Sequence, residues 1–363
     1  MSAKTEFHAL PIASVRREAG GAIAVTFAIP SEKSALFAFE PGQHIAIRHM
    51  EGAEELRRNY SICAGPGEPL RIAIKSVDDG RFSRWACATL APGMTLDVMP
   101  PTGRFTLPAP AESAPRRILL IAAGSGITPI LGITRKALLD EPSTHVTLVY
   151  GNRSAEHAIF GEEIEDLKDR YLGRFEVIHV LSQDAATEMP LLQGRITGEK
   201  IRALAAGLID PTLADHIFLC GPGTMIREVR DALFALGVAK SRVHHEFFAP
   251  GGGAYRAPAR AAAPAAFPAG PAAELVAVLD GARHIIAMTK GETVLTAALR
   301  AGLKAPYSCT GGMCSTCRAR IVEGAATMAV NYSLEPWEIE KGFVLTCQAV
   351  PTSAKLVVDY DAM

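Results

Sequence analysis

The chain has 363 residues, 48% of them hydrophobic, and a formal net charge of −1. This length predicts two or three domains, and the evenly mixed charge excludes the basic surface that a nucleic-acid-binding protein needs. No apolar run reaches the length of a membrane span. Residues 1–8 lack the apolar core of an export signal, so we expect a cytoplasmic protein with reduced thiols.

Residues 1–110 show the pattern of an antiparallel β-barrel. Apolar residues alternate with polar or small ones in short runs, such as 23–29 and 70–75, and Pro-Gly or Gly-Pro pairs separate the runs. Short alternating runs bounded by turn residues are typical of antiparallel strands. We therefore expect a barrel domain in the first part of the chain.

One string in this segment carries groups that suit a flavin. Arg58, Tyr60 and Ser61 follow one another closely, and Gly80 and Ser83 stand further along. A guanidinium can bind a phosphate, a phenol can pack against the ring, and a hydroxyl can reach a ring nitrogen. The Gly80–Ser83 string can complete a phosphate cradle. Taken alone, both strings are also ordinary strand or loop fragments.

Residues 111–248 change to an α/β pattern. Continuous apolar runs, such as 118–123 and 217–220, are typical of parallel strands that are buried on both faces. Stretches with helical spacing of apolar residues lie between such runs, for example 224–236. The alternation of strands and helices predicts a doubly wound α/β domain.

Two glycine-containing turns follow buried strands of this domain. The first follows run 118–123 and opens a helix, and the second follows run 217–220. Glycines let the backbone approach a pyrophosphate, a helix N-terminus offers N–H groups, and proline suits the first helical turn. Because ligands bind where the strands of such sheets end, the turns predict a dinucleotide site. Its residues are Gly124, Gly126, Thr128, Pro129, Cys220, Gly221 and Pro222.

Arg153 and Ser154 follow a third apolar run, 146–150. A cation and a hydroxyl at this place can hold the 2′-phosphate of NADPH, whereas NADH is usually recognised by an acidic side chain on the ribose. The pair therefore favours NADPH. The other interpretation is that Arg153 merely caps a solvated loop.

Residues 249–273 consist mostly of alanine, proline and glycine, which predicts a semi-flexible linker that cannot form a core. Residues 274–363 then form a tethered module. It begins with two apolar runs around Asp280-Gly281, typical of a hairpin, and continues with an amphipathic helix over 293–300. Hairpin, helix and later strands predict a small β-grasp domain.

Four of the seven cysteines have the spacing Cys309-x4-Cys314-x2-Cys317-x29-Cys347. This spacing is that of the ligands of a plant-type [2Fe–2S] cluster. A structural zinc site usually has two Cys-x2-Cys pairs, and only one occurs here. A disulfide framework is typical of small secreted chains, which this is not. The quartet therefore favours the cluster.

Taken together, these strings resemble the ferredoxin–NADP reductase superfamily over nearly the whole chain, and residues 331–348 are similar to the reductase subunits of phenylacetyl-CoA epoxidases. The resemblance implies FAD in the barrel, although Asp79 departs from a glycine found in many members and leaves FMN open. It implies that the acidic-aromatic end of the nucleotide domain, Glu246-Phe247-Phe248, lies near the flavin. Ser61, Cys220 and Glu246 would then act at the hydride-transfer centre, with Phe248 as a flavin contact.

The expected function follows from electron numbers. A nicotinamide gives up two electrons as a hydride and a [2Fe–2S] cluster accepts one at a time, so a flavin must stand between them. The resemblance further implies an NADPH-dependent reductase that supplies the oxygenase component of a multicomponent di-iron monooxygenase, phenylacetyl-CoA epoxidase. Alternatives are a reductase for a ring-hydroxylating or steroid oxygenase or a fatty-acid desaturase, a redox sensor, or an electron-transfer subunit like that of dihydroorotate dehydrogenase. The last has a much shorter final cysteine gap.

Overall fold

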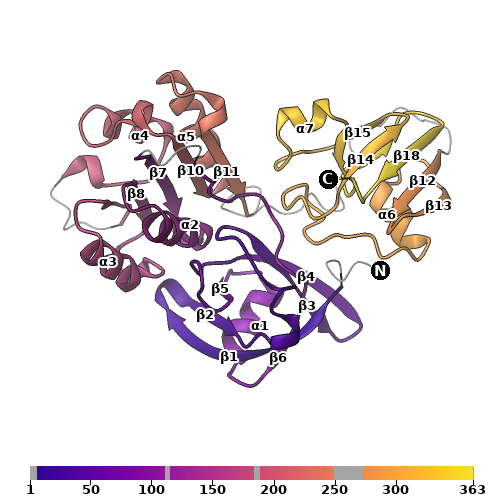
Figure 1. Ribbon diagram of the computed structural model, residues 1–363, viewed down its shortest axis with the longest axis horizontal. Coiled ribbons are helices and arrows are strands. Elements are labelled where there is room, and N and C mark those ends of the chain that lie inside the picture. Colours follow the sequence, from indigo (N-terminus) through magenta and orange to yellow (C-terminus); the bar gives the residue numbers. More distant parts are fainter. Residues whose placement is uncertain (1–5, 111–114, 184–188, 249–272, 363) are drawn as a thin grey trace. The chain divides into compact units, whose positions relative to one another are not determined.

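The computed structural model of the chain describes residues 6–110, 115–183, 189–248 and 273–362 (Figure 1). Contacts between residues divide the chain into two compact units. One unit holds the two N-terminal sheets and the other holds the C-terminal sheets. Of the linker expected at 249–273, all but Ala273 lies outside the described residues.

Residues 6–110 contain a six-stranded antiparallel sheet with the order β4-β3-β6-β1-β2-β5. Its apolar side chains form one core that includes Val25, Ile47 and Ile72. The helix α1 packs on this core through Phe82 and Ala86. The alternating strand pattern of this segment did not predict it. The elements are β1 (His8–Glu18), β2 (Ala22–Phe27), β3 (His44–Glu51), β4 (Glu54–Ser61), β5 (Arg71–Lys75), α1 (Arg81–Thr89) and β6 (Thr95–Val98).

Residues 115–183 and 189–248 form a parallel sheet with the order β11-β10-β7-β8-β9, and helices cover its faces (Figure 1). The central strands β7, β8 and β10 are mostly apolar and buried, as the sequence predicted, whereas β9 and β11 also carry half-buried histidines. The elements are β7 (Arg117–Ala123), α2 (Ile127–Asp140), β8 (His145–Asn152), α3 (Gly161–Arg170), β9 (Phe175–Leu181), α4 (Gly198–Ala205), β10 (His216–Gly221), α5 (Gly223–Ala235) and β11 (Val243–Phe247).

A cluster of ion pairs joins these two domains. Glu163 on α3 accepts two hydrogen bonds of 2.8 Å from Arg71 on β5 and one of 2.6 Å from Arg135 on α2. Arg16 on β1 also contacts Glu163, and Arg135 contacts Glu68 in the barrel domain. Burial alone would raise the pKa of Glu163, but the hydrogen bonds and charge of Arg71 outweigh it and hold that pKa below its usual range.

Half-buried histidines lie on the two strands at one side of the parallel sheet. His216 on β10 and His244 on β11 are 3.1 Å apart between Nδ1 and Nε2, and His244 stacks on Phe218 with the ring centroids 4.7 Å apart. Burial lowers the pKa of His244 to about 4, and the neighbouring imidazole of His216 adds to the shift. His244 is therefore neutral in the folded protein at neutral and mildly acidic pH.

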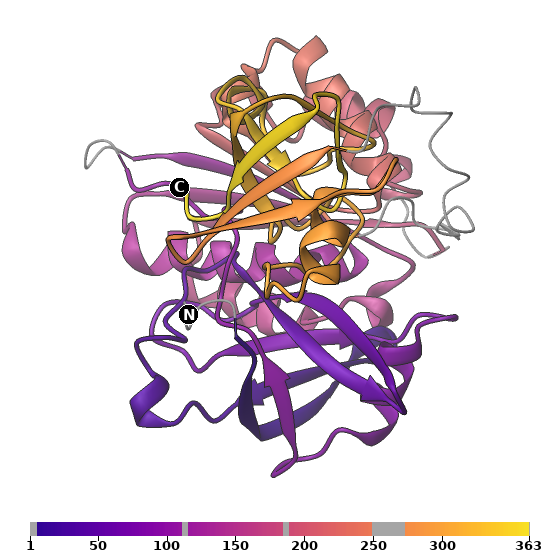
Figure 2. The same cartoon turned by 90° about the vertical axis from the view of Figure 1, so that its right-hand side faces the viewer.

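Residues 273–362 form a separate sheet with the order β13-β12-β18-β14-β16, on which α6 packs, and a small sheet of β15 and β17. Asp280 and Gly281 have φ of +53° and +74°, the conformation of the tight hairpin turn expected there. Figure 2 shows β12, β13 and β18 side by side. The elements are β12 (Glu274–Leu279), β13 (Ala282–Ala287), α6 (Val294–Arg300), β14 (Arg318–Glu323), β15 (Ala326–Met328), α7 (Pro336–Glu340), β16 (Phe343–Leu345), β17 (Ala349–Pro351) and β18 (Lys355–Asp359).

The depressed pKa of His244 predicts a loss of stability in acid. Between its unfolded pKa of about 6.5 and its folded pKa of about 4, the unfolded chain binds a proton that the folded chain does not, so stability falls as pH falls through this window. His244→Gln should flatten this dependence, measured as the urea midpoint of the first unfolding transition at pH 8, 6 and 5. His145→Gln, at an exposed site of the same sheet, should retain it. An unchanged slope in His244→Gln would contradict the assignment.

Candidate functional sites

The loop at 124–129 connects β7 to α2 at the middle of the parallel sheet. The chain order of the strands reverses between β7 and β10, and such a switch point is where doubly wound sheets bind ligands. Gly124 has φ of +53°, a conformation that glycine adopts without strain. The Thr128 hydroxyl donates to the Ser125 carbonyl at 3.0 Å, and Pro129 lies in the first turn of α2.

Two glycines allow the ends of β7 and β10 to approach closely. A Cβ atom on Gly126 would lie 2.2 Å from the carbonyl oxygen of Cys220, which is a backbone atom that cannot move aside easily. A Cβ atom on Gly221 would lie 2.8 Å from Cε of Met225. Pro222 follows and begins α5 as its N-cap. The two turns predicted from the sequence therefore lie side by side.

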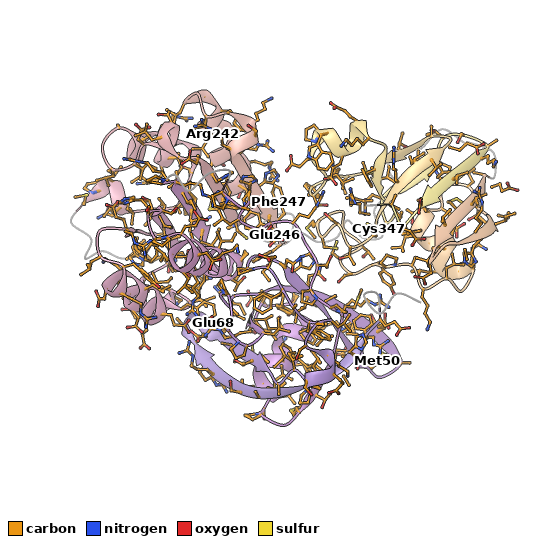
Figure 3. The ribbon with its side chains drawn as sticks, viewed as in Figure 1. Met50, Glu68, Arg242, Glu246, Phe247 and Cys347 are labelled. Carbon is orange, nitrogen blue, oxygen red and sulfur yellow. The ribbon has the colours of Figure 1, made fainter. Side chains whose placement is uncertain are left out.

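Ser61, Cys220 and Glu246 come together where the barrel meets the nucleotide domain. Ser61 ends β4, and its hydroxyl donates to Oε2 of Glu246 at 3.0 Å. Glu246 on β11 is in register with Cys220 on β10. Burial raises the pKa of the Cys220 thiol, and the charge of Glu246 raises it further, so this thiol stays protonated. Figure 3 labels Glu246 and Phe247, the last two residues of β11.

The aromatic and cationic residues expected to hold the flavin lie on β4 and beyond β11. Tyr60 packs beside Phe82 with the ring centroids 5.8 Å apart. Arg58 stands two residues earlier, so its side chain leaves the strand on the same face; it is exposed and donates to the carbonyl of Arg57 at 2.7 Å. Phe248, directly after β11, is 37% exposed.

Gly80 and Ser83 form a tight turn that opens α1. A Cβ atom on Gly80 would lie 2.2 Å from Oγ of Ser83 and 2.5 Å from Cγ2 of Val77, so only glycine fits. The Ser83 hydroxyl accepts from the Val77 N–H and donates to the Gly80 carbonyl, both at 3.3 Å. A glycine turn at a helix N-terminus suits a phosphate group. The barrel residues therefore fit a flavin nucleotide.

Two cations stand beside the nucleotide loop, one from each domain. Lys75 ends β5, and its Nζ lies 4.0 Å from the position of a Cβ atom on Gly124. Burial lowers the pKa of Lys75, and the charge of Arg153 lowers it further. A bound anion would relieve this repulsion. Sequence reasoning missed Lys75, because it is remote in the chain from the loop that it approaches.

Ser154 is already engaged by its own loop. Its hydroxyl contacts Oε2 of Glu156 at 2.6 Å and Nδ1 of His157 at 2.9 Å. Glu156 thus places a carboxylate close to a side chain expected to face a phosphate. The acidic neighbour of Ser154, Glu156, is one that the sequence argument overlooked.

The four cysteines of the quartet form two pairs in the C-terminal module. Cys309 and Cys314 share a hydrogen bond, which with burial raises the pKa of Cys309. Cys317 and Cys347 share another, which raises the pKa of Cys317 and lowers that of Cys347. The second pair is buried, whereas the first pair is half-buried. Figure 3 labels Cys347 within this module.

The loop that carries three of these cysteines has an unusual backbone. Thr310 and Ser315 adopt φ of +50° and +53°, which non-glycine residues rarely do. The N–H groups of Gly311 and Met313 donate to Sγ of Cys309 at 3.4 and 3.5 Å. Strained backbone and N–H groups directed at sulfur are both features of loops that hold an iron–sulfur cluster.

The four thiols of the quartet lie as two pairs. Within the described residues, no group of three or more His, Cys, Asp or Glu side chains that could hold a metal ion is found. In a [2Fe–2S] cluster each iron takes two of the four thiolates, so the ligands gather as pairs. The pairs Cys309–Cys314 and Cys317–Cys347 fit the cluster.

Polar contacts in residues 331–348 hold the fourth cysteine against the loop. Arg318, next to Cys317, donates to the fully buried Glu338 of α7 at 2.7 Å. The backbone N–H and hydroxyl of Thr346, next to Cys347, both donate to the Cys317 carbonyl, at 3.1 and 2.9 Å. This arrangement gives a structural reason why the sequence resemblance was sharp in this segment.

Comparisons with known proteins agree with this division of the chain. Family models match an oxidoreductase FAD-binding domain at residues 11–107, an oxidoreductase NAD-binding domain at 120–231 and a 2Fe-2S iron-sulfur cluster binding domain at 277–352. The chain is 41% identical over 361 residues to one of the subunits of 1,2-phenylacetyl-CoA epoxidase from Escherichia coli (strain K12), and the alignment covers 99% of both chains.

The chain belongs to the family of flavin- and iron–sulfur-containing oxygenase reductases. Another relative of this reductase, the ferredoxin reductase component of 3-ketosteroid-9-alpha-monooxygenase from Rhodococcus rhodochrous, is 33% identical, with 97% of this chain and 96% of the relative covered. The solved structure of phthalate dioxygenase reductase shares the fold, with a TM-score of 0.59 and 24% identity over 97% of this chain and 98% of that one.

These matches confirm the predicted fold class: an antiparallel flavin domain, a parallel α/β nucleotide domain and a C-terminal ferredoxin-type domain. They also confirm that the reductase is an oxidoreductase with domains for FAD, a nicotinamide nucleotide and a [2Fe–2S] cluster. Among the described residues, no helix has the length and hydropathy needed to span a membrane.

Gly126→Ala should impair nucleotide binding, because the added methyl group would overlap the Cys220 carbonyl. Overpacking of this kind costs about 1–3 kcal/mol, and if this cost falls on the loop that binds the nucleotide, the Kd for NADP⁺ should rise about 5- to 140-fold. Calorimetric titration measures it, with Gly207→Ala as the control, since a Cβ atom there meets nothing within 4 Å. Equal affinities in both variants would argue against the close approach.

Cys347→Ser should remove the cluster and spare the flavin, because Cys347 belongs to the separate C-terminal unit. Iron content and the visible spectrum measure the first effect, and NADPH oxidation with a soluble dye measures the second. Cys87→Ser, outside the quartet, should keep both iron and dye reduction. Loss of dye reduction together with iron in Cys347→Ser would contradict the independence of the domains.

Proposed function

We propose that this reductase takes electrons from NADPH and delivers them, through FAD and the [2Fe–2S] cluster, to the oxygenase component of a phenylacetyl-CoA epoxidase. The observation that supports this choice is the 41% identity, over the full length of both chains, with the Escherichia coli epoxidase protein. A cytoplasmic location is part of the proposal, because the cluster thiolates suit a reducing compartment.

Bound FAD supplies the chemistry that joins two-electron and one-electron carriers. The residues of the chain would position the reactants around it. Arg58 and the Gly80–Ser83 turn would hold the phosphates of FAD, and Tyr60 and Phe248 would pack against its ring. Residues 124–129 with Gly221 and Pro222 would hold the nucleotide, so that the nicotinamide meets the flavin beside Ser61, Cys220 and Glu246.

The four thiolates Cys309, Cys314, Cys317 and Cys347 would hold the two irons. The half-buried pair Cys309–Cys314 lies closer to solvent than the buried pair, and an electron can leave most readily from the exposed side of a cluster. No acid or base toward an organic substrate is required, because the reductase handles electrons, one hydride and its proton.

The preference for NADPH is supported by the two cations beside the nucleotide loop, Lys75 and Arg153, whose charges repel one another until an anion binds. Glu156 acts in the opposite direction through its contact with Ser154. The cations prevail in this proposal because two positive charges, from two segments of the chain, oppose one carboxylate.

Arg153→Ala should therefore weaken the binding of NADPH far more than the binding of NADH. The loss of one charge-assisted hydrogen bond to a phosphate costs about 1.5–3 kcal/mol, which predicts a rise of about 10- to 100-fold in the KM for NADPH. Dye reduction with each coenzyme measures the two KM values. Arg170→Ala, an exposed site at the end of α3, serves as the control. Equal losses for the two coenzymes would remove the phosphate-binding role.

The acceptor can be tested by reconstitution. The purified reductase is mixed with the oxygenase components of a phenylacetyl-CoA epoxidase, and NADPH consumption is followed with and without phenylacetyl-CoA. We expect substrate-dependent NADPH consumption with accumulation of the epoxide. A 3-ketosteroid 9α-oxygenase component and its steroid form the second arm, since a reductase for that system is 33% identical. Faster coupled turnover in the steroid arm would overturn the choice of acceptor.

A further inference from the structure

We propose that Gln348 raises the reduction potential of the [2Fe–2S] cluster by donating a hydrogen bond from its side-chain amide to the sulfur of Cys347. The same amide binds the carbonyl of Thr310, so it also ties the loop of the first three cysteines to the fourth. The inference rests on the cluster in the proposed function and is independent of which oxygenase accepts the electrons. Neither the sequence argument nor the comparisons give Gln348 a role.

The side chain of Gln348 connects the segments that carry the two thiol pairs. Its Nε2 donates to the carbonyl oxygen of Thr310 at 2.8 Å and to Sγ of Cys347 at 3.5 Å. Thr310 follows Cys309, a member of the half-buried pair, whereas Cys347 belongs to the buried pair. One amide group therefore reaches both halves of the quartet.

The Thr310 carbonyl determines which end of the amide faces the sulfur. A carbonyl oxygen accepts hydrogen bonds and repels another oxygen, so the atom of Gln348 that lies 2.8 Å from it is the NH₂ nitrogen. This nitrogen carries two protons. One proton is used by Thr310, and the other is directed to Cys347. The contact with Thr310 thus orients the amide as a donor toward the sulfur.

Gly312 makes room for the side chain of Gln348. A Cβ atom on Gly312 would lie 3.2 Å from Cγ of Gln348 and 3.0 Å from Cγ2 of Val330. Gly312 also has φ of +76°, a conformation that residues other than glycine rarely adopt. The backbone of Gln348 is fixed as well, because its N–H donates to the Leu345 carbonyl at 2.8 Å and its carbonyl accepts from the N–H of Ala329 at 3.2 Å. These contacts define the path of the side chain to the sulfur.

A hydrogen bond to a ligand sulfur changes the free energy of holding an electron. Each electron that arrives from the reduced flavin adds one negative charge, which spreads over the irons and their sulfur ligands. A donor N–H beside a thiolate stabilises this charge, so it favours the reduced form and raises the potential. The electron then leaves for the oxygenase component, and no bond of the protein forms or breaks. The thiol of Cys347 stands here for the thiolate that would bind iron.

Gln348 differs from the other donors in this loop because it can be removed by substitution. The N–H groups of Gly311 and Met313 donate to Sγ of Cys309 at 3.4 and 3.5 Å, but they belong to the backbone and remain in a side-chain variant. Loss of the Gln348 amide would remove one donor to the quartet and leave these two in place. The potential then reports the contribution of a single hydrogen bond.

Asn331 provides a matched control in the same segment. Its Nδ2 donates to the Leu334 carbonyl at 2.9 Å, and its Oδ1 accepts from the N–H of Leu334 at 2.8 Å. Both bonds join the amide to backbone. Asn331→Ala therefore loosens residues 331–348 without removing a donor to sulfur, and it measures what loosening alone does to the potential.

The first test leaves the protein unchanged. Full-length reductase loaded with FAD and cluster is prepared by cell-free synthesis with glutamine labelled with ¹⁵N at Nε only, and the reduced cluster is studied by pulsed EPR. Of the four glutamines in the sequence, only Gln348 belongs to residues 273–363. We expect a ¹⁵N coupling with an isotropic part, because a hydrogen bond transmits spin density, and its absence in Gln348→Met. A wild-type spectrum without this coupling would overturn the bond to sulfur.

The second test measures the potential in two variants that lack a donor, Gln348→Met and Gln348→Leu. In each, the reduced form should become about tenfold less favoured, the lower end of what a hydrogen bond to a charged group contributes. For one electron, tenfold equals a fall of about 59 mV, measured by EPR-monitored titration with mediator dyes. Asn331→Ala should stay within about twofold of the wild type. Wild-type potentials in both Gln348 variants, at wild-type iron content, would overturn the effect; if both variants lose iron, the ¹⁵N coupling decides.

These outcomes are distinguishable from failure of the proposed function. The two measurements require neither NADPH nor an oxygenase, so a wrong choice of acceptor would leave the inference about Gln348 standing. If the wild-type protein binds no [2Fe–2S] cluster, the proposed function and the inference are both wrong. If the wild type supplies the oxygenase with electrons while its potential and ¹⁵N spectrum are independent of Gln348, the inference alone is wrong.

Discussion

Hydride transfer requires the donor and acceptor rings to be held within a few tenths of an ångström of their reactive positions, and in this chain they are bound by different domains. Carboxylates of the nucleotide domain bridge that division. Glu246 reaches Ser61 and His44 at the site itself, and Glu163 joins Arg71 of the barrel domain to Arg135 on α2. Since α2 begins at the nucleotide loop, the second contact fixes the helix whose N-terminus carries the loop. Both contacts are largely buried, so solvent and salt weaken them little.

Glycines of the site also allow atoms to approach one another closely. Gly126 allows the nucleotide loop to touch the backbone of β10, and Gly103 allows His44 to face Glu246. At each point a single methyl group would separate groups that lie close together. The glycine at 80 serves the flavin turn in the same manner. Close backbone approach, rather than a large number of polar contacts, is therefore what shapes this centre.

The C-terminal module carries the four thiolates that would bind two irons. Its loop places Thr310 and Ser315 in a left-handed conformation, which costs energy that the surrounding contacts must offset. Those contacts include the buried Arg318–Glu338 pair and the bonds of Thr346 to the Cys317 carbonyl. A buried ion pair adds little net stability but restricts the chain to one arrangement, which here would keep Cys347 near Cys317.

The sequence by itself determined the fold class, because it depends on short-range periodicity. Spacing alone also carried the predictions of the cysteine quartet and the two glycine turns. The alternation of apolar and polar residues distinguishes the strands of the barrel from those of the parallel sheet. A continuous apolar run such as 118–123 identifies a buried strand of the parallel sheet without tertiary information. The sequence also pointed to Ser61, Cys220 and Glu246 as residues of the hydride-transfer centre, although only through its resemblance to a family. Nothing local to those residues indicates that they meet.

Only the tertiary structure decided which distant residues share a site. Three pairs of residues, each remote in the chain, become neighbours because the barrel domain contacts the nucleotide domain: Lys75 and Gly124, His44 and Glu246, and Arg71 and Glu163. A contact between close neighbours in the chain can also escape sequence reasoning. The side chain of Glu156 reaches Ser154 because of the turn that follows β8. Charge, burial and distance are properties of the folded arrangement, and a linear pattern does not encode them at separations of this length.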